Sequence, residues 1–327
     1  MLRKRPVPYK IPVLEAILKR ISKKHPERER VSKDLAHRKS GYRGEQNLDY
    51  YLRQLSFGYQ YIFPGLRLPH SETEFFQIDS LLLTNRFYVT FEAKNVAGSL
   101  LVEEHQLQQT INEQTQAFQN PLVQAENQLF HLNNLMKDYL HIQLPHTCFV
   151  VMTNPSCIIH FDPSYRHIAA PKMIRPSAIR HKVEHFSRQY PNPVLSTEQL
   201  HRLATLLLQL DTPLRHDIFQ EFHISKKDIL PGLFCNDCKL LTVIRYRGRW
   251  ICTRCKKENP KAPIEALIDY YYLIGNTITN RELRAFFKLN SISVATKLLV
   301  ALGLPVSGQK RNRVYHLSLE KLKSLLK

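Results

Sequence analysis

Three charged residues between residues 75 and 94 have the types and spacing of a divalent metal site. Asp79 and Glu92 are carboxylates, and Lys94 follows Glu92 after one intervening residue. Mg²⁺ in proteins is commonly held by one or two carboxylates, with water and substrate phosphates filling its other positions. The three side chains therefore indicate metal-dependent chemistry, provided that the fold brings them together.

The same stretch predicts a β-hairpin centred between Asn85 and Arg86. Two runs rich in Phe, Leu, Ile, Val and Thr, residues 75–84 and 87–94, flank this short polar break, as is typical of paired antiparallel strands. Asn suits the first position of a tight turn, but Arg is a poor second residue where a left-handed conformation is required. We therefore expect a hairpin whose turn lacks the usual glycine.

That hairpin would place the three charged residues on one face of the sheet. A loop of two residues, or of four with the same centre, pairs Asp79 with Glu92 across the ladder. Lys94 lies two residues beyond Glu92 and projects from the same face. Because like charges directly opposite each other destabilise a sheet, the two carboxylates need a compensating cation, for which a divalent metal is the natural candidate.

Four segments, in order along the chain, resemble the nuclease-related domain (NERD) family of the PD-(D/E)XK nuclease superfamily. They are Gly44-Glu45, Gln77-Ile78-Asp79, Glu92-Ala93-Lys94-Asn95 with Gly98, and Asn120-Pro121 with Gln124. The resemblance covers roughly residues 40–155. Ile78 stands where the superfamily's name has proline, and this departure removes no catalytic group.

The resemblance implies a metal-dependent nuclease that hydrolyses phosphodiester bonds, most simply in DNA. Asp79 and Glu92 would hold Mg²⁺ or Mn²⁺, with Glu45 joining them directly or through water. Lys94 would hold the attacking water and neutralise developing charge, and Gln124 would approach that water or a phosphate. The alternatives are that Glu45 only favours the helix dipole and that Gln124 is a surface residue.

A rival interpretation is a non-catalytic DNA-binding or regulatory protein on a nuclease scaffold. Loss of any one of Asp79, Glu92 and Lys94 would have favoured it, and all three are present. The nuclease hypothesis is therefore the better supported of the two.

The elements expected to position these residues predict an α/β protein with a restriction-endonuclease-like αβββαβ core and a mixed sheet. They are a helix over residues 42–56, a strand over 59–68, the hairpin, a helix from residue 121 to about 140 and a strand over 147–152. Glu45 falls on the face of the first helix that its leucines bury. Asn120 as N-cap and Pro121 at the first helical position open the second helix. Residues 100–118 show no clean period.

Four of the six cysteines form two C-x-x-C pairs separated by thirteen residues. They are Cys235, Cys238, Cys252 and Cys255. Zn²⁺ takes four thiolates from two such knuckles, with a hairpin between them, and closure of so small a module depends on the metal. Two pairs outnumber what a redox dithiol requires. The sequence therefore predicts a zinc ribbon.

Between the cysteine pairs, three arginines alternate along one short segment. Arg245, Arg247 and Arg249 would share one face of a strand, with Tyr246 and Trp250 on the other. The functional interpretation is a face that contacts phosphates. The alternative is a ribbon that only joins domains.

The residues after Pro260 resemble a winged helix-turn-helix. Helices are expected over residues 264–274, 280–287 and 293–302, followed by a basic segment over 308–317 that alternates into a strand. The third helix would enter the major groove. The expected nucleic-acid contacts are Lys297, Lys310, Arg311 and Arg313. Three helices with a β-wing serve protein contacts as well, so that alternative stays open.

Charge and composition indicate a nucleic-acid partner, with DNA favoured over RNA. Lys and Arg number 47 against 28 acids, giving a net charge of +19, which favours a polyanion over a membrane surface. Residues 1–40 carry thirteen basic and four acidic residues. Apart from a short helix over 13–21 they are expected to be solvated, either as an arm on DNA or as a charged face.

The sequence predicts four parts: a basic N-terminal arm at 1–40, a nuclease-like domain at 41–230, a zinc ribbon at 231–260 and a winged-helix-like domain at 261–327. No apolar run reaches the roughly 18 residues of a membrane span. The start has no signal-peptide pattern. Paired cysteines that suit a metal favour a reducing compartment, and the expected location is the cytoplasm.

Overall fold

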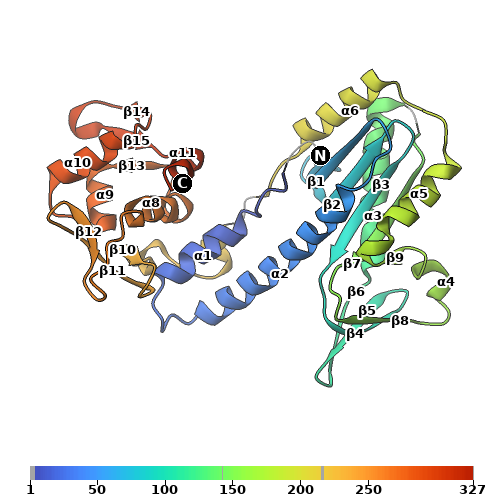
Figure 1. The fold of residues 1–327 in the computed structure, drawn as a ribbon, viewed down its shortest axis with the longest axis horizontal. Coiled ribbons are helices and arrows are strands. Elements are labelled where there is room, and N and C mark those ends of the chain that lie inside the picture. Colours follow the sequence, from blue (N-terminus) through green and yellow to red (C-terminus); the bar gives the residue numbers. More distant parts are fainter. Residues whose placement is uncertain (1–3, 142, 215–216, 327) are drawn as a thin grey trace. The chain divides into compact units, whose positions relative to one another are not determined.

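The computed structural model describes residues 4–141, 143–214 and 217–326, without the side chains of Leu140 and Arg311. The chain divides into two compact units (Figure 1). The sheet unit comprises the residues up to Val7 together with His37–Leu214. The cysteine unit comprises Pro8–Ala36 and the residues after Leu214. The division falls within the long helix α2, Arg28–Leu52.

A five-stranded mixed sheet forms the centre of the sheet unit, in the order β1-β2-β3-β7-β9. The strands are β1 (Gln60–Pro69), β2 (Phe75–Thr84), β3 (Tyr88–Lys94), β7 (His146–Met152) and β9 (Met173–Ile174). β1, β2 and β3 are antiparallel neighbours, whereas β7 runs parallel to β3. With α2 before β1 and α3 (Pro121–Leu140) before β7, the predicted αβββαβ order is confirmed.

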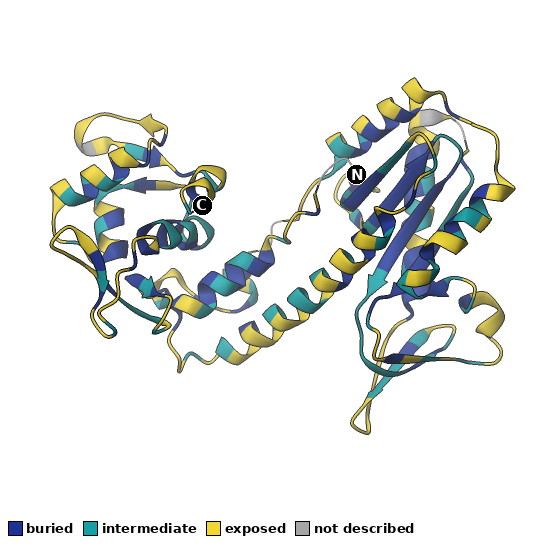
Figure 2. Cartoon of the chain, in the orientation of Figure 1, coloured by how far each residue is buried: buried dark blue, intermediate teal, exposed yellow. Residues whose placement is uncertain are grey.

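Helices cover both faces of this sheet because successive strand residues are apolar on both sides. On one face Leu81 and Leu83 pack with side chains of α3 and α6 (Thr197–Leu210). On the other face Leu82 and Val89 pack with α2 and α5 (Ile179–Gln189). The strands are accordingly buried while the helices show alternating buried and exposed stripes (Figure 2).

The hairpin between β2 and β3 has the predicted register. Ser80 pairs with Phe91 and Leu83 with Tyr88. Neither Asn85 nor Arg86 in the turn has a positive φ. The Thr84 hydroxyl instead accepts hydrogen bonds from the N–H groups of Arg86 and Phe87, at 3.1 and 3.0 Å. A side chain therefore closes this turn without a glycine.

A second sheet contains residues 100–118, whose sequence shows no clean period, together with a later strand. Its order is β6-β5-β4-β8, with β4 (Gly98–Val102), β5 (Gln106–Ile111), β6 (Gln114–Gln119) and β8 (Cys157–Phe161). Leu100, Val102 and Leu107 are its buried residues in β4 and β5, whereas β6 is exposed throughout. With so few apolar positions, the strands show no clean alternation. The short helix α4 (Arg166–Ala169) and the 3₁₀ turn at Pro176–Ala178 follow.

The short helix predicted over 13–21 is present, but the prediction that the rest of residues 1–40 is solvated was wrong, because Lys10 and Val31 are buried. Helix α1 (Lys10–Arg20) buries Val13, Leu14 and Ile17 in the cysteine unit. Lys10 and Arg20 are themselves buried, 3% and 0% exposed. Acids far along the chain pair with them, including Asp269 at 2.9 Å from Arg20, which is why the charge count alone misled. Helix α2 likewise begins at Arg28, well before residue 42.

One hydrophobic core joins the cysteine-rich segment of the cysteine unit to its helices. The segment is a three-stranded sheet of β10 (Leu233–Cys235), β11 (Leu240–Tyr246) and β12 (Arg249–Cys252), preceded by α7 (Ile218–Glu221) and a 3₁₀ turn at Lys226–Asp228. Trp250 packs edge-on against Phe287, their ring centroids 6.3 Å apart.

Helices α8 (Ala262–Leu273), α9 (Asn280–Phe287), α10 (Ile292–Ala301) and α11 (Leu319–Ser324) follow. A small sheet of β13 (Thr277–Thr279), β15 (Val314–His316) and β14 (Val306–Ser307) accompanies them, with a 3₁₀ turn at Lys310–Asn312. Among the described residues, no helix combines the length and apolar character needed to cross a membrane.

Candidate active site and metal centre

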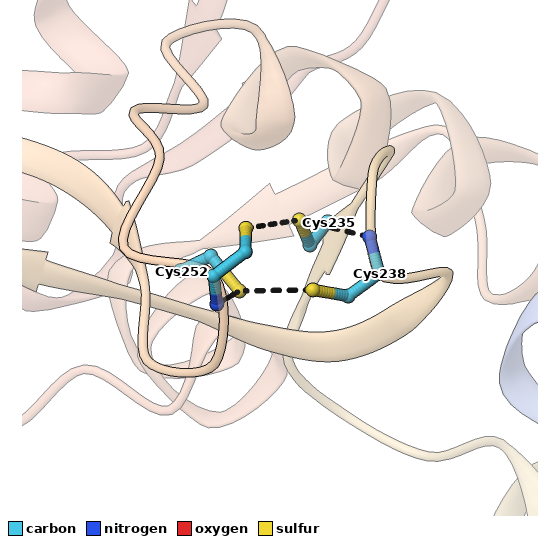
Figure 3. Close-up of side chains that lie close together, drawn as sticks. Cys235, Cys238 and Cys252 are labelled. Atoms are coloured by element: carbon cyan, nitrogen blue, oxygen red, sulfur yellow. Dashed lines mark hydrogen bonds between the residues drawn. The ribbon is translucent and has the colours of Figure 1, made fainter.

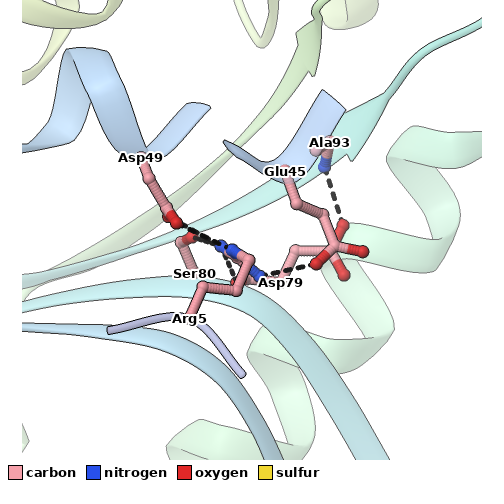
Figure 4. Close-up of polar contacts among 6 residues, drawn as sticks. All are labelled: Arg5, Glu45, Asp49, Asp79, Ser80 and Ala93. Atoms are coloured by element: carbon pink, nitrogen blue, oxygen red, sulfur yellow. Dashed lines mark hydrogen bonds and ion pairs between the residues drawn. The ribbon is translucent and has the colours of Figure 1, made fainter. Parts of the chain in front are cut away.

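Asp79 and Glu92 lie on adjacent strands, as the hairpin register requires. Asp79 directly precedes Ser80 on β2 and Glu92 directly follows Phe91 on β3, and Ser80 and Phe91 are paired. Oδ2 of Asp79 accepts a hydrogen bond of 2.9 Å from the N–H of Ala93 (Figure 4). Glu92 is buried, 4% exposed, and Asp79 is half-buried.

Lys94 links Glu92 to helix α3. Its Nζ donates to Oε1 of Glu92 at 2.7 Å and to Oε1 of Gln124 at 2.9 Å. Gln128, one turn further along α3, donates from Nε2 to the other oxygen of Glu92 at 3.1 Å. The structure thus brings Gln124 to Lys94, and it adds Gln128, which sequence reasoning missed. Its spacing of four residues from Gln124, on the same helix face, was the available signal.

Close packing of α2 on the end of β3 brings Glu45 to the same region. A Cβ on Gly44 would lie 2.7 Å from Asn95 Cβ and 2.7 Å from Thr153 Oγ1, so only glycine allows this approach. Nδ2 of Asn95 also donates to the backbone oxygen of Ser40 at 2.8 Å. The glycine and the asparagine of the family pattern therefore have a packing role beside the acid that they position.

Arg5 joins the acidic cluster, and sequence reasoning missed it completely. Its guanidinium donates to both carboxylate oxygens of Asp49 at 2.8 Å and to Oε2 of Glu45 at 2.7 Å. It also donates to the backbone oxygen of Asp79 at 2.8 Å and to Ser80 Oγ at 2.7 Å (Figure 4). Arg5 is 6% exposed. No local pattern in a strongly basic segment marks such a residue.

The electrostatics of the cluster fit a divalent cation. Burial and the negative charges of Glu92 and Glu45 raise the pKa of Asp79 well above its ordinary value. Burial also raises the pKa of Glu45, although Arg5 opposes the rise. The four carboxylates Glu45, Asp49, Asp79 and Glu92 lie with two cations, Arg5 and Lys94. When all are ionised the balance is minus two, the charge that one Mg²⁺ or Mn²⁺ would neutralise.

The four predicted zinc-ligand cysteines converge, and Figure 3 shows Cys235, Cys238 and Cys252 of this cluster. Sγ of Cys235 lies 3.7 Å from Sγ of Cys255, and Sγ of Cys238 lies 3.8 Å from Sγ of Cys252. A zinc tetrahedron with Zn–S bonds of about 2.3 Å has sulfur–sulfur edges of about 3.8 Å. The spacing prediction is therefore confirmed as a cluster whose geometry fits Zn²⁺.

Backbone donors surround the cysteine sulfurs in the manner of a thiolate site. Burial raises the pKa of Cys252, but hydrogen bonds from Thr242 Oγ1 and from the N–H groups of Cys255 and Arg254 outweigh it and bring the pKa to about 6. Burial and the neighbouring cysteine sulfurs raise the pKa of Cys238 to about 12, whereas the thiolate is the form of cysteine that binds a metal.

The two clusters differ in how tightly their ligand atoms gather. Among the described residues, the four cysteines are the only group of three or more Cys, His, Asp or Glu side chains whose ligand atoms all lie within 4.8 Å of one another. The carboxylates of Glu45, Asp79 and Glu92 do not form such a group.

The prediction that Arg245, Arg247 and Arg249 share one face was wrong. Arg247 and Gly248 form a two-residue turn with φ values of 43° and 82°. Arg245 therefore pairs with Trp250 across the ladder, and its guanidinium lies 4.9 Å from the Trp250 ring centroid. Arg249 is on the opposite face and pairs with Glu258 at 2.7 Å. All three arginines are exposed.

The remaining predicted nucleic-acid contacts lie in the cysteine unit. Lys297 is exposed on α10, and Lys310 and Arg313 are exposed before β15. The side chain of Arg311 lies outside the described residues. Their role in nucleic-acid binding stays a prediction.

Residues 40–153 match the family model described as the nuclease-related domain. The matched range runs from within α2 to the end of β7 and includes Glu45, Asp79, Glu92, Lys94 and Gln124. The chain therefore contains a nuclease-related domain, as the resemblance implied. No curated protein and no solved structure matches the chain.

Proposed function

We propose that the nuclease-related domain of this chain is a metal-dependent nuclease that hydrolyses phosphodiester bonds, with DNA as its favoured substrate. The observation that carries the proposal is the convergence of Asp79, Glu92 and Lys94 beside helix α3. An acid whose pKa is raised by burial and by neighbouring carboxylates, as that of Asp79 is, is typical of functional sites. Each of the three residues also stands at the matching position of the family pattern.

The carboxylates are the groups that would hold the metal. Asp79 and Glu92 are assigned to direct coordination, and Glu45 to coordination through water, because Arg5 already holds one oxygen of Glu45. Mg²⁺ or Mn²⁺ bound there would supply Lewis-acid activation of the phosphate and of the attacking water.

The surrounding side chains supply position and charge. Lys94, whose side chain is 26% exposed, would hold the attacking water with its Nζ and stabilise charge that develops on the phosphate. Gln124 fixes the ammonium group of Lys94, and Gln128 fixes Glu92. Neither glutamine has to exchange a proton.

The cysteine unit would bind nucleic acid and deliver it to the nuclease site. Zn²⁺ held by the four cysteines would stabilise the ribbon. The order of α8, β13, α9, α10 and a β14–β15 hairpin supports a winged-helix-like module, with α10 as the helix for the major groove. The net charge of +19 supports the same partner.

Cleavage of supercoiled plasmid with Mg²⁺ or Mn²⁺ tests the proposal. The wild-type chain should nick it, the metal chelator EDTA should stop the reaction, and Asp79→Ala should be inactive. Asp138→Ala is the matched control, because Asp138 is exposed on α3 in the same unit. It should cleave at the wild-type rate. Wild type that cleaves no DNA or RNA with either metal would instead support the non-catalytic binding protein.

A further inference from the structure

We propose that Arg5 is a positioning residue of the nuclease site, which holds Glu45 in place for the divalent cation bound by Asp79 and Glu92. The inference rests on the proposed function, since it assigns a metal to those acids. Its subject is a residue outside the matched range of 40–153. The N-terminal segment thereby becomes part of the site.

Arg5 is buried and forms hydrogen bonds to several acceptors in the interior of the sheet unit. Two nitrogens of its guanidinium donate hydrogen bonds to Asp49 in the fork geometry that suits carboxylates, and the third donates to Glu45. Asp49 follows Glu45 by one turn of α2, so both acids face the same cation. Exposed ion pairs contribute little, but Arg5 and Asp49 are 6% and 1% exposed.

The contact with Glu45 explains how Arg5 would act on a metal. Arg5 engages Oε2 of Glu45 and leaves Oε1 for a water or a metal. Glutamate has several rotatable side-chain bonds, and holding one oxygen removes most of that freedom before the metal binds. Partners that orient metal-binding groups typically change metal affinity or activity by about 10–100-fold when they are mutated.

Binding of Mn²⁺ to the zinc-loaded full chain tests this role without requiring cleavage. The paramagnetic resonance signal of free Mn²⁺ measures the affinity. Arg5→Met keeps an unbranched side chain without charge and should weaken binding by about 10–100-fold. Glu45→Gln should weaken it as well. Because Arg5 acts through Glu45, the double variant should be no weaker than Glu45→Gln alone.

Two further variants separate positioning from folding. Arg20→Met removes another buried arginine that pairs with an acid, Asp269, and should leave Mn²⁺ affinity unchanged. Arg5→Lys keeps the charge but cannot form the fork, so its affinity should fall between those of wild type and Arg5→Met. It serves as the measurement if Arg5→Met does not fold.

Additive losses in the double variant, or wild-type affinity in both Arg5 variants, would overturn the inference. Failure of the proposed function gives a different result, in which Mn²⁺ binds and depends on Asp79 but no substrate is cut. If Asp79→Ala binds Mn²⁺ as wild type does, or if neither binds it, both proposals are overturned.

A separate observation concerns α9, and we infer that a cleft beside it binds the phosphodiester backbone of nucleic acid. The cleft has a volume of about 390 Å³. Its lining consists of Arg281, Arg284, Ala285, Lys288, Leu289 and Asn290. Arg281 and Arg284 are three positions apart on α9, so they share one side of the helix. Lys288 is the C-cap residue of α9, and the lining includes no acid.

Several like charges in one cleft repel each other unless an anion joins them, and arginine binds phosphate with two parallel hydrogen bonds. Arg284 is already oriented, since its Nε donates to Asn280 Oδ1 at 3.0 Å. This site is distinct from the predicted contacts on α10 and before β15. Phosphate groups are the class of ligand that it fits.

Fluorescence anisotropy of a labelled DNA duplex tests this cleft. Arg281→Gln with Lys288→Gln should weaken binding and lower the slope of log affinity against log salt by about two, one for each lost phosphate contact. The matched control is Lys321→Gln with Lys323→Gln on α11, both exposed. Equal effects of the two pairs of substitutions, or no effect of the first pair, would overturn the site. The site would also be overturned if added inorganic phosphate did not weaken DNA binding.

Discussion

The two candidate metal sites of this chain are built in opposite ways. The cysteine cluster takes four ligands from two short knuckles, 20 residues apart at most, and gathers them within 4.8 Å. The acidic cluster draws on α2, β2, β3, α3 and the segment before α1, with Arg5 and Ser80 separated by 75 residues. A compact set of four identical ligands suits a structural metal, whereas a metal held by one or two carboxylates keeps positions for water and substrate.

Metal removal should therefore affect the two units very differently, and this is the largest effect we expect. Stripping zinc, or Cys252→Ser, should unfold the cysteine ribbon, because zinc binding in such modules is worth about 10–16 kcal/mol. Removing Mg²⁺ should leave the helix and strand content of the sheet unit unchanged. Circular dichroism melts with zinc analysis of the same samples make the measurement. A ribbon that stays folded without zinc would contradict the interpretation that the cysteine site is structural and the acidic site is not.

A second contrast concerns what the lysine does. Lys94→Ala should lower the cleavage rate by about 10²–10³-fold, as expected when a donor to developing charge is lost. DNA affinity should change little, because one lysine among 47 basic residues makes a small contribution to phosphate neutralisation. Nicking rates and anisotropy on the same preparation give both values. A parallel loss of affinity would indicate that Lys94 binds substrate rather than serving the reaction.

The contrast between the sites also decides what the sequence could predict. Cysteine spacing and the alternation of β2 and β3 are local patterns, and both the cysteine cluster and the Ser80–Phe91 register were predicted correctly. Arg5 was missed because its partners lie 40 to 75 residues away. Its basic neighbours made it look solvated.

The prediction that Arg245, Arg247 and Arg249 share one face was wrong for a different reason. The alternation rule holds only within one strand, and Arg247-Gly248 forms a turn. A two-residue loop that ends in glycine was a readable hairpin signal. Residues 98–119 carried too few apolar positions for any period to show, although they form three strands.

Two glycines on α2 sharpen the account of how Glu45 is positioned. Gly44→Ala should destabilise the sheet unit by about 1–3 kcal/mol, because the new methyl group overlaps Asn95 and Thr153. Gly41→Ala is the matched control on the same helix, where an added Cβ meets nothing within 4 Å. It should stabilise by up to about 1 kcal/mol through helix propensity. Urea titrations of both variants measure the two signs, and equal effects would mean that α2 does not pack closely here.

The smallest effect tests the repulsion that distinguishes the acidic cluster from the cysteines. Burial and the charges of Glu92 and Glu45 raise the pKa of Asp79 in the folded chain. A raised pKa means that the folded state binds the proton more tightly than the unfolded state, so stability is highest below the ordinary pKa of aspartate and falls as pH rises through the raised value. Metal-free Asp79→Asn should therefore melt higher than wild type at neutral pH.

The expected difference is a few degrees, since about 1 kcal/mol corresponds to about 2–4 °C for a unit of this size. It should vanish near pH 3, where Asp79 is protonated in both states. Saturating Mg²⁺ should reverse the order, because only wild type gains stability from the bound ion. Thermal melts at three pH values, with and without Mg²⁺, measure all of these signs. If Asp79→Asn melts lower than wild type in metal-free buffer at neutral pH, the hydrogen bond from Ala93 to Asp79 stabilises the fold. Repulsion among the carboxylates would then not be the larger effect.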